Sequence, residues 1–117
     1  MKQTVNARDY LGRIVTIEMD RPLGTKHPDH GFIYERNYGF VPGTISGDGE
    51  ELDAYILNVD TAIDRFTGLC VAVIHRTDDN DDKLIIIPDD DTITDEQIEE
   101  QISFRETKYH HVLWRAE

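Results

Sequence analysis

Two apolar runs in the second half of the chain constrain its fold more than any other feature. Residues 68–77 read GLCVAVIHRT and residues 83–88 read KLIIIP, so nearly every position is apolar. A strand that packs on only one side alternates apolar and polar residues instead. The two runs therefore predict strands covered on both faces, joined by the acidic loop DDNDD.

Weaker strand signals precede these runs. Residues 12–19 (GRIVTIEM) alternate between two faces, which predicts a half-buried strand. Residues 30–41 are rich in aromatic side chains and predict one or two short strands, and residues 51–59 predict another after a glycine-rich segment.

One helix signal is clear, and it starts at Thr94. Thr94 and Gln97 form a capping box, and acidic residues follow the cap, where they favour the positive end of the helix dipole. Ile98 and Ile102 lie one turn apart and give the helix an apolar stripe. We expect this helix to extend to Tyr109.

The order of these elements predicts the fold class. The last residues, HHVLWRAE, are expected to return Val112 and Trp114 to the core. Five or more strands in short antiparallel connections, followed by one helix, indicate a mainly β fold. We predict a single domain over residues 1–117, built as a small closed or partly open antiparallel β-barrel of OB-like type with a C-terminal helix.

Composition narrows the class of partner. The net charge is −12, with 24 acidic and 12 basic residues, which disfavours nucleic acid or an anionic membrane as partner. Cys70 is the only cysteine, so no internal disulfide forms, and its apolar neighbours indicate a buried thiol. The first residues lack the apolar core of a signal peptide, and no apolar run approaches a membrane span. We expect a cytoplasmic protein.

Two groups of carboxylates could carry chemistry. The segment DGEELD contains Asp48, Glu50, Glu51 and Asp53, and like charges this close raise each other's pKa unless a cation intervenes. Mg²⁺ typically binds one or two carboxylates together with waters and substrate phosphates. The residues alone leave two interpretations open, a solvated acidic turn or a divalent cation site.

The second group is the loop between the two apolar runs. It contributes Asp78, Asp79, Asp81 and Asp82 and is followed by Lys83, which beside a metal cluster would be a phosphate partner. An acidic tip is also an ordinary feature of a β-hairpin. The loop therefore indicates a metal site only if it lies against the first group.

The segment NYGFVPGTISGDGEELDAYIL resembles the core signature of the soluble inorganic pyrophosphatases of the barrel-fold type. Asn37, Tyr38 and Gly39 match its first part, and the three acidic positions fall on Asp48, Glu50 and Asp53, with Glu50 where the family has aspartate. The resemblance covers roughly residues 12 to 110.

Further positions match outside this signature. Asp81 and Lys83 keep the Asp-x-Lys spacing of the family, and Asp78 corresponds to an earlier aspartate of a loop that is shorter here. Glu18 matches a strand glutamate, and Lys26 lies where the family carries a phosphate-binding arginine.

The resemblance implies a metal-dependent hydrolase that converts pyrophosphate to two phosphates. The implied ligands of two or more Mg²⁺ ions, with Mn²⁺ as an alternative, are Asp48, Glu50, Asp53, Asp78, Asp81 and Glu18. Glu50 would be the general base, and Tyr38 and Lys83 would complete the catalytic group. The implied phosphate-binding residues are Lys26, Tyr38, Lys83 and Tyr109. The family usually forms homo-oligomers.

This sequence also departs from the family. The segment between Glu18 and Asn37 is shorter, and a Lys-aromatic-Glu hairpin of the family has no counterpart. The loop RPLGTKHPDHG is either a replacement for its basic groups or a surface loop. The extra methylene of Glu50 displaces its carboxylate by about 1 Å, which can cost ~10²-fold in rate. In KYHH, either Tyr109 or Lys108 faces the site.

These departures leave other functions open. One alternative is hydrolysis of another small phosphorylated compound, because losing a hairpin would open the site. Another is a non-catalytic homologue that binds metal or a phosphate ligand, and a third is a structural subunit.

Overall fold

The computed structural model describes residues 2–47, 49–79 and 81–116. Five strands form a barrel in the order β2 (Ile14–Arg21), β3 (Asn37–Phe40), β5 (Asp53–Ile56), β7 (Asp82–Ile87) and β6 (Arg65–Arg76), and pairing of β2 with β6 closes it. The remaining elements are β1 (Gln3–Thr4), the 3-10 helix η1 (Ala7–Tyr10), β4 (Thr44–Ile45), α1 (Asp95–Glu106) and β8 (His111–Arg115). The predicted mainly β barrel with a late helix is confirmed.

The barrel is antiparallel except at one pairing. β5 and β7 run parallel, with Ala54 opposite Leu84. After β5 the chain forms β6 and then returns as β7, which inserts between β5 and β6. β7 runs antiparallel to β6 and parallel to β5. This parallel pair brings Asp53 opposite Lys83.

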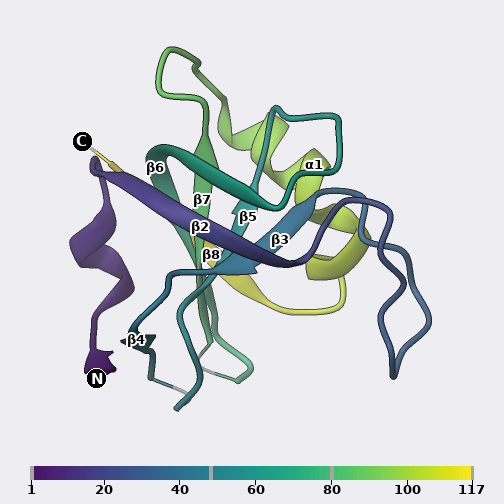
Figure 1. Cartoon of the computed structure of the whole chain (residues 1–117), viewed down its shortest axis with the longest axis horizontal. Helices are drawn as coiled ribbons and strands as arrows, with labels where there is room; N and C mark the ends of the chain where they lie inside the picture. Colours follow the sequence, from purple (N-terminus) through teal and green to yellow (C-terminus); the bar gives the residue numbers. More distant parts are fainter. Residues whose placement is uncertain (1, 48, 80, 117) are drawn as a thin grey trace.

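The two apolar runs are covered on both faces, as predicted. Alternate residues of β6 and β7 belong to two separate buried clusters, one inside the barrel and one between the barrel wall and α1. The interior cluster includes Val15, Ile17, Ala54, Ile56, Cys70, Val73, Leu84 and Ile86. The cluster under the helix includes Tyr55, Ala72, Ile74, Ile85, Ile87, Ile98 and Ile102. In Figure 1, α1 lies across one side of the barrel and η1 lies on the opposite side.

The capping box at the start of α1 is confirmed. The Thr94 hydroxyl accepts a hydrogen bond from the backbone N–H of Gln97, and the Gln97 side chain accepts one from the backbone N–H of Thr94. The expected extension to Tyr109 is wrong, because α1 ends at Glu106. Thr107 caps the helix, its hydroxyl donating to the carbonyl of Ser103, and the chain then turns to pair with β6.

The C-terminal strand only partly meets its prediction. β8 pairs with the outer edge of β6, and Trp114 packs against the interior cluster. Val112 was expected in the core and is 44% exposed, because it pairs with His75 near the open end of the sheet.

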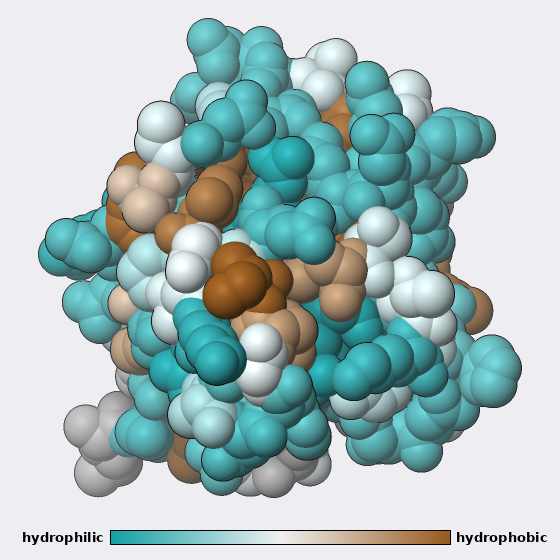
Figure 2. Space-filling view, turned by 90° about the vertical axis from the view of Figure 1, so that its right-hand side faces the viewer, coloured by the Kyte–Doolittle hydropathy of each residue, from teal (hydrophilic) through white to brown (hydrophobic). Residues whose placement is uncertain are grey.

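The surface agrees with the acidic composition. The side that carries the loop between β2 and β3 is covered mainly by hydrophilic residues, and its hydrophobic areas are small and separate (Figure 2). No helix in the described ranges is long and apolar enough to cross a membrane.

Candidate active site

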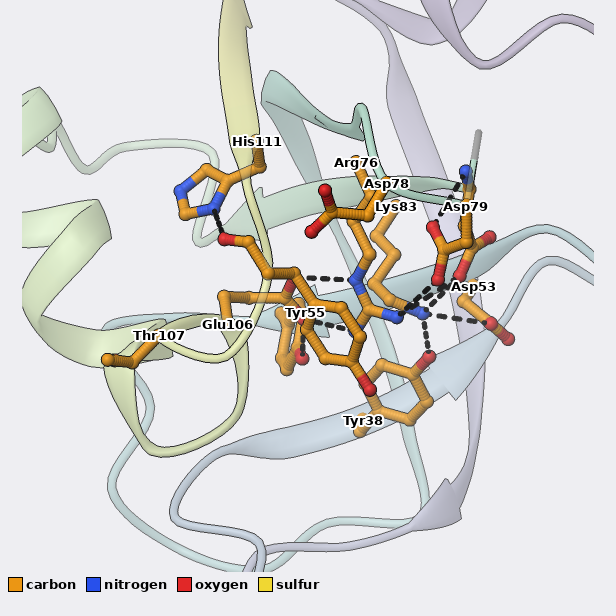
Figure 3. A network of polar contacts seen from close by, with 12 residues as sticks. Tyr38, Asp53, Tyr55, Arg76, Asp78, Asp79, Lys83, Glu106, Thr107 and His111 are labelled. Carbon is orange, nitrogen blue, oxygen red and sulfur yellow. Dashed lines mark hydrogen bonds and ion pairs between the residues drawn. The ribbon is translucent and has the colours of Figure 1, made fainter.

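A network of charged side chains lies on the barrel wall next to α1 (Figure 3). Tyr38 in β3 lies opposite Tyr55 in β5, and Asp53 lies opposite Lys83 in β7. Paired residues point to the same side of a sheet, so these side chains share the face that α1 covers. The last residue of β6, Arg76, and the last residue of α1, Glu106, complete the network.

Lys83 is the centre of one half of the network. Its ammonium nitrogen donates to the Tyr38 hydroxyl at 2.5 Å and lies 3.3 Å from Oδ2 of Asp53 and 3.1 Å from Oδ2 of Asp81. Only 3% of Lys83 is exposed. Burial alone would lower its pKa, but the two carboxylates outweigh burial and raise the pKa, so Lys83 stays charged.

Tyr38 is held as a neutral hydroxyl beside this cation. Burial, and then the negative charge of Asp53, raise the pKa of Tyr38 well above its usual value. The phenol therefore remains protonated at neutral pH. A neutral phenol next to an ammonium group provides two hydrogen-bond donors to an anionic ligand.

The other half of the network is an ion pair between Arg76 and Glu106. Arg76 Nε donates to Oε1 of Glu106 at 2.8 Å, and its Nη2 donates to Oε2 at 2.6 Å. The Tyr55 hydroxyl also donates to Oε2 at 2.6 Å. Arg76 is 4% exposed and Glu106 is fully buried. The ring of Tyr109 covers the guanidinium, with 3.9 Å between Cζ and the ring centroid.

Both members of this pair are ionised. Burial alone would raise the pKa of Glu106, but the hydrogen bonds from Arg76 and Tyr55 outweigh it, and the pKa lies below its usual value. Burial would lower the pKa of Arg76, and the bonds to Glu106 raise it instead. A bidentate pair of this kind fixes both side chains in one geometry.

Three cations and one carboxylate act on the Tyr34 hydroxyl through their charges: Arg105, Arg21, Lys83 and Asp20. Burial raises the pKa of Tyr34, and the positive charges of Arg105, Arg21 and Lys83 oppose that rise. Partial burial raises the pKa of Asp20. The neighbouring Arg21 opposes this rise, and the negative charges of Asp53 and Glu51 add to it. We call Arg21, Arg105 and Asp20 the rim, because their charges act on the same region as Lys83 does.

Several residues predicted from the sequence come together here. Tyr38, Asp53 and Asp81 all contact Lys83, and Tyr109 lies over Arg76 in the adjoining half. The two acidic groups of the sequence therefore meet through Asp53 and Asp81.

Other predicted residues lie elsewhere. Asp78 is turned outward, accepting hydrogen bonds from the backbone N–H of His110 at 2.7 Å and pairing with its Nδ1 at 3.0 Å. Glu50 is exposed, and its carbonyl accepts a bond from the Ser46 N–H in a turn. Lys26 is exposed in the loop after β2, where it forms a bridge to Ile33. Asp48 lies outside the described residues.

Glu18 and Lys108 complete the set of predicted positions. Glu18 is half-buried in β2, opposite Phe40, and makes no ion pair with the residues that the structure describes. Lys108 is exposed after α1. Of the two candidates in KYHH, Tyr109 is the one that contacts the network.

The donor chemistry fits a divalent ion only in part. Asp53 and Asp81 both approach one cation, the Lys83 ammonium, so their oxygens can share a partner. Within residues 2–47, 49–79 and 81–116, no three His, Cys, Asp or Glu side chains are arranged to hold a metal ion. Two carboxylates suffice for Mg²⁺ when waters and phosphate oxygens supply the other ligands.

Arg76 and Glu106 are the main residues that the sequence interpretation missed. Both carried a usable signal. Arg76 follows Ile74 by two positions in a strand predicted to be covered on both faces, so its side chain needs a buried anionic partner. Glu106 continues the buried stripe of Ile98 and Ile102 at the same spacing of four.

Comparisons with known proteins agree with this architecture. The family model described as inorganic pyrophosphatase matches residues 13–112. The inorganic pyrophosphatase of Mesorhizobium japonicum is 33% identical over 85 residues, which cover 66% of this chain and 48% of that protein. Soluble inorganic pyrophosphatase 2 of Chlamydomonas reinhardtii is 32% identical over 68% of this chain and 46% of its own length. The chain thus spans about half the length of the curated relatives it matches.

Solved structures share the fold. The inorganic pyrophosphatase from Ehrlichia chaffeensis superposes with a TM-score of 0.68 at 14% identity, covering 99% of this chain and 92% of that chain. The inorganic pyrophosphatase from Neisseria gonorrhoeae gives a TM-score of 0.63 at 22% identity, covering 80% and 72% respectively.

Proposed function

Because this chain belongs to the inorganic pyrophosphatase family, we propose that it hydrolyses phosphoanhydride bonds, with pyrophosphate as substrate and Mg²⁺ as the activating ion. The observation that carries the proposal is the convergence of Tyr38, Asp53 and Asp81 on Lys83. These residues come from two signature segments far apart in the sequence, and they meet in one buried cluster.

The side chains divide the work by charge. Lys83 and Tyr38 bind phosphoryl oxygens through an ammonium and a phenol that stay protonated at neutral pH. Asp53 and Asp81 are the ligands for Mg²⁺, with Asp48 and Glu50 added from the signature. Bound Mg²⁺ supplies Lewis-acid polarisation of the phosphoryl group and a lower pKa for attacking water. Glu50 is proposed as the base on the strength of the signature, although the structure places it exposed in the turn that precedes β5.

The rim supplies the charge that the absent hairpin provides in the family. Arg21 and Arg105 both act on the Tyr34 hydroxyl, as Lys83 does, so their positive charges reach the same region. We assign them to the second phosphoryl group, which leaves with negative charge that needs compensation. This assignment replaces Lys26, which is exposed and bridges to Ile33.

We extend the proposal to the protein's setting. A cytoplasmic homo-oligomer that acts on a small phosphorylated substrate agrees with the family resemblance and with the strongly acidic composition. Sedimentation equilibrium at micromolar concentration measures the assembly directly.

A second candidate is a homologue that binds a phosphate ligand without hydrolysing it. The specific observation in its favour is that Lys83 already pairs with both Asp53 and Asp81. Carboxylates held by a fixed cation are less available to a divalent ion.

Phosphate release from pyrophosphate with Mg²⁺ or Mn²⁺ separates the two. We expect turnover by the wild-type protein and a loss of about 100-fold in Asp53→Asn and in Glu50→Gln. The matched control is Asp60→Asn, which removes an exposed carboxylate paired with Arg36 and should leave the rate unchanged.

The outcomes discriminate cleanly. Turnover that persists in both site variants would rule out this site. Absence of turnover, combined with Mg²⁺-dependent pyrophosphate binding that Asp53→Asn abolishes, would establish the binding homologue.

A further inference from the structure

Arg76 lies inside the carboxylate cluster, although the proposed chemistry gives it no role. Its Nη1 is 3.6 Å from Oδ2 of Asp81, and the same oxygen is 3.1 Å from the Lys83 ammonium. A second carboxylate, Asp79, lies 3.5 Å from that Nη1. Two fixed cations therefore approach one carboxylate that the proposed function assigns to a metal ion.

The guanidinium cannot easily leave this position. Glu106 holds it through two hydrogen bonds, the Tyr109 ring covers it, and almost none of it contacts solvent. Glu106 is in turn fixed by the Tyr55 hydroxyl. A cation held this rigidly acts on Asp81 whether or not a ligand is present.

The charge balance shows what this does to a divalent ion. At Asp81 the negative charge is opposed by two cations, because one carboxylate oxygen lies near both Lys83 and Arg76, whereas the wider network sets four carboxylates (Asp53, Asp79, Asp81 and Glu106) against the same two cations. A divalent ion needs an excess of negative charge, and each fixed cation nearby opposes it. The same fixed cations favour binding of a phosphate ligand, because its charge is negative.

We propose that Arg76 is a built-in cation of this site, which competes with a divalent ion for Asp81 and lowers the affinity of the site for divalent metals. Glu106 is its positioning residue. The inference rests on the proposed function only in taking Asp81 as a ligand.

Two variants change, in opposite directions, how much of the negative charge of Asp81 is compensated by nearby cations. The double variant Arg76→Met/Glu106→Gln removes both charges at similar volume and keeps an acceptor for Tyr55. We expect it to bind Mn²⁺ about tenfold tighter than the wild type. Glu106→Gln alone removes the negative charge that compensates Arg76, so the full positive charge of the guanidinium acts on Asp81. We expect Mn²⁺ binding to weaken about tenfold or more.

Calorimetric titration with Mn²⁺ alone, without phosphate, measures both effects, and circular dichroism confirms folding. The control Arg36→Met/Asp60→Asn makes the same charge change in a surface pair with 2.8 Å between nitrogen and oxygen, and should bind Mn²⁺ as the wild type does. Arg76→Lys keeps the positive charge and should also resemble the wild type. If Arg76 had only a structural role, the Mn²⁺ affinity would not follow the charge at this position.

Each outcome decides the matter. Equal Mn²⁺ affinity in the wild type and the double variant would overturn the inference and leave the proposed function standing. Uptake by the double variant but not by the wild type would support the inference. Absence of uptake in every variant would overturn the inference, and the turnover assay with pyrophosphate would still test the proposed function.

Discussion

Where β6 ends and β7 begins, the two faces of the sheet carry similar charged residues that differ in how deeply they are buried. On the face under α1, Arg76 and Lys83 are almost fully buried and share Asp81. On the other face, His75 pairs with Asp82 at 2.5 Å, with 22% and 26% of these side chains exposed. The His75 ring stacks on Trp114 at 4.7 Å between centroids.

The buried and the half-exposed carboxylate are adjacent residues in the chain. Asp81 and Asp82 are neighbours in the chain, yet strand alternation sends them to opposite faces. The buried face needs every member of its network, because a buried charge without a partner is costly. The half-exposed pair has water as an alternative partner, so removing it should cost little.

The sharpest test of this difference is Arg76→Met alone. It leaves Glu106 buried without its guanidinium partner, and among the residues that the structure describes the Tyr55 hydroxyl is its remaining side-chain hydrogen-bond donor. We expect a loss of about 3–5 kcal/mol in the free energy of unfolding, measured by urea denaturation at pH 7. A loss below about 1 kcal/mol would mean that water reaches Glu106 and that the two faces do not differ.

Glu106→Gln should have a smaller effect that depends on pH. The pKa of Glu106 in the folded protein lies below its usual 4.5, so its contribution is complete above that pH and disappears as the pH falls through the folded-state pKa. We expect the variant to be less stable by about 2 kcal/mol at pH 7.

Urea denaturation from pH 7 to pH 3 tests the sign. The difference between wild type and Glu106→Gln should be constant down to about pH 5 and shrink in more acidic solution. A gap that widens on acidification would show that Glu106 is protonated in the folded protein at neutral pH.

On the half-exposed face, Asp82→Asn should cost at most about 1 kcal/mol at pH 7. The amide oxygen can still accept a hydrogen bond from His75 in place of the carboxylate. Thermal unfolding beside Arg76→Met gives the direct comparison. A cost equal to that of Arg76→Met would remove the distinction between the two faces.

The smallest effect concerns Cys70, on β6 inside the barrel. Burial raises the pKa of its thiol to about 12, so we expect no reaction with a disulfide reagent at pH 8 in the native protein and full reaction in urea. In Arg76→Met the same assay reports whether damage on the helix face opens the interior. Rapid reaction of the native wild type would contradict the closed barrel.

Much of this structure could be predicted from the sequence. Apolar residues at nearly every position of 68–77 and 83–88 required cover on both faces, and the capping box fixed the start of α1 at Thr94. The family resemblance identified Tyr38 and Asp53 in the signature, and Asp81 and Lys83 outside it. Local periodicity and short motifs carry this information because they depend on residues close together in the chain.

Tertiary structure alone decided which charges meet. Arg76 and Glu106 are 30 residues apart, and only the packing of α1 on the barrel brings them into contact. Asp78 and Asp81 look equivalent in the sequence, yet one binds His110 at the surface and the other lies between two buried cations. Alternation predicts which side of a strand a residue takes, but its partner depends on strand register and helix position, which the whole fold determines.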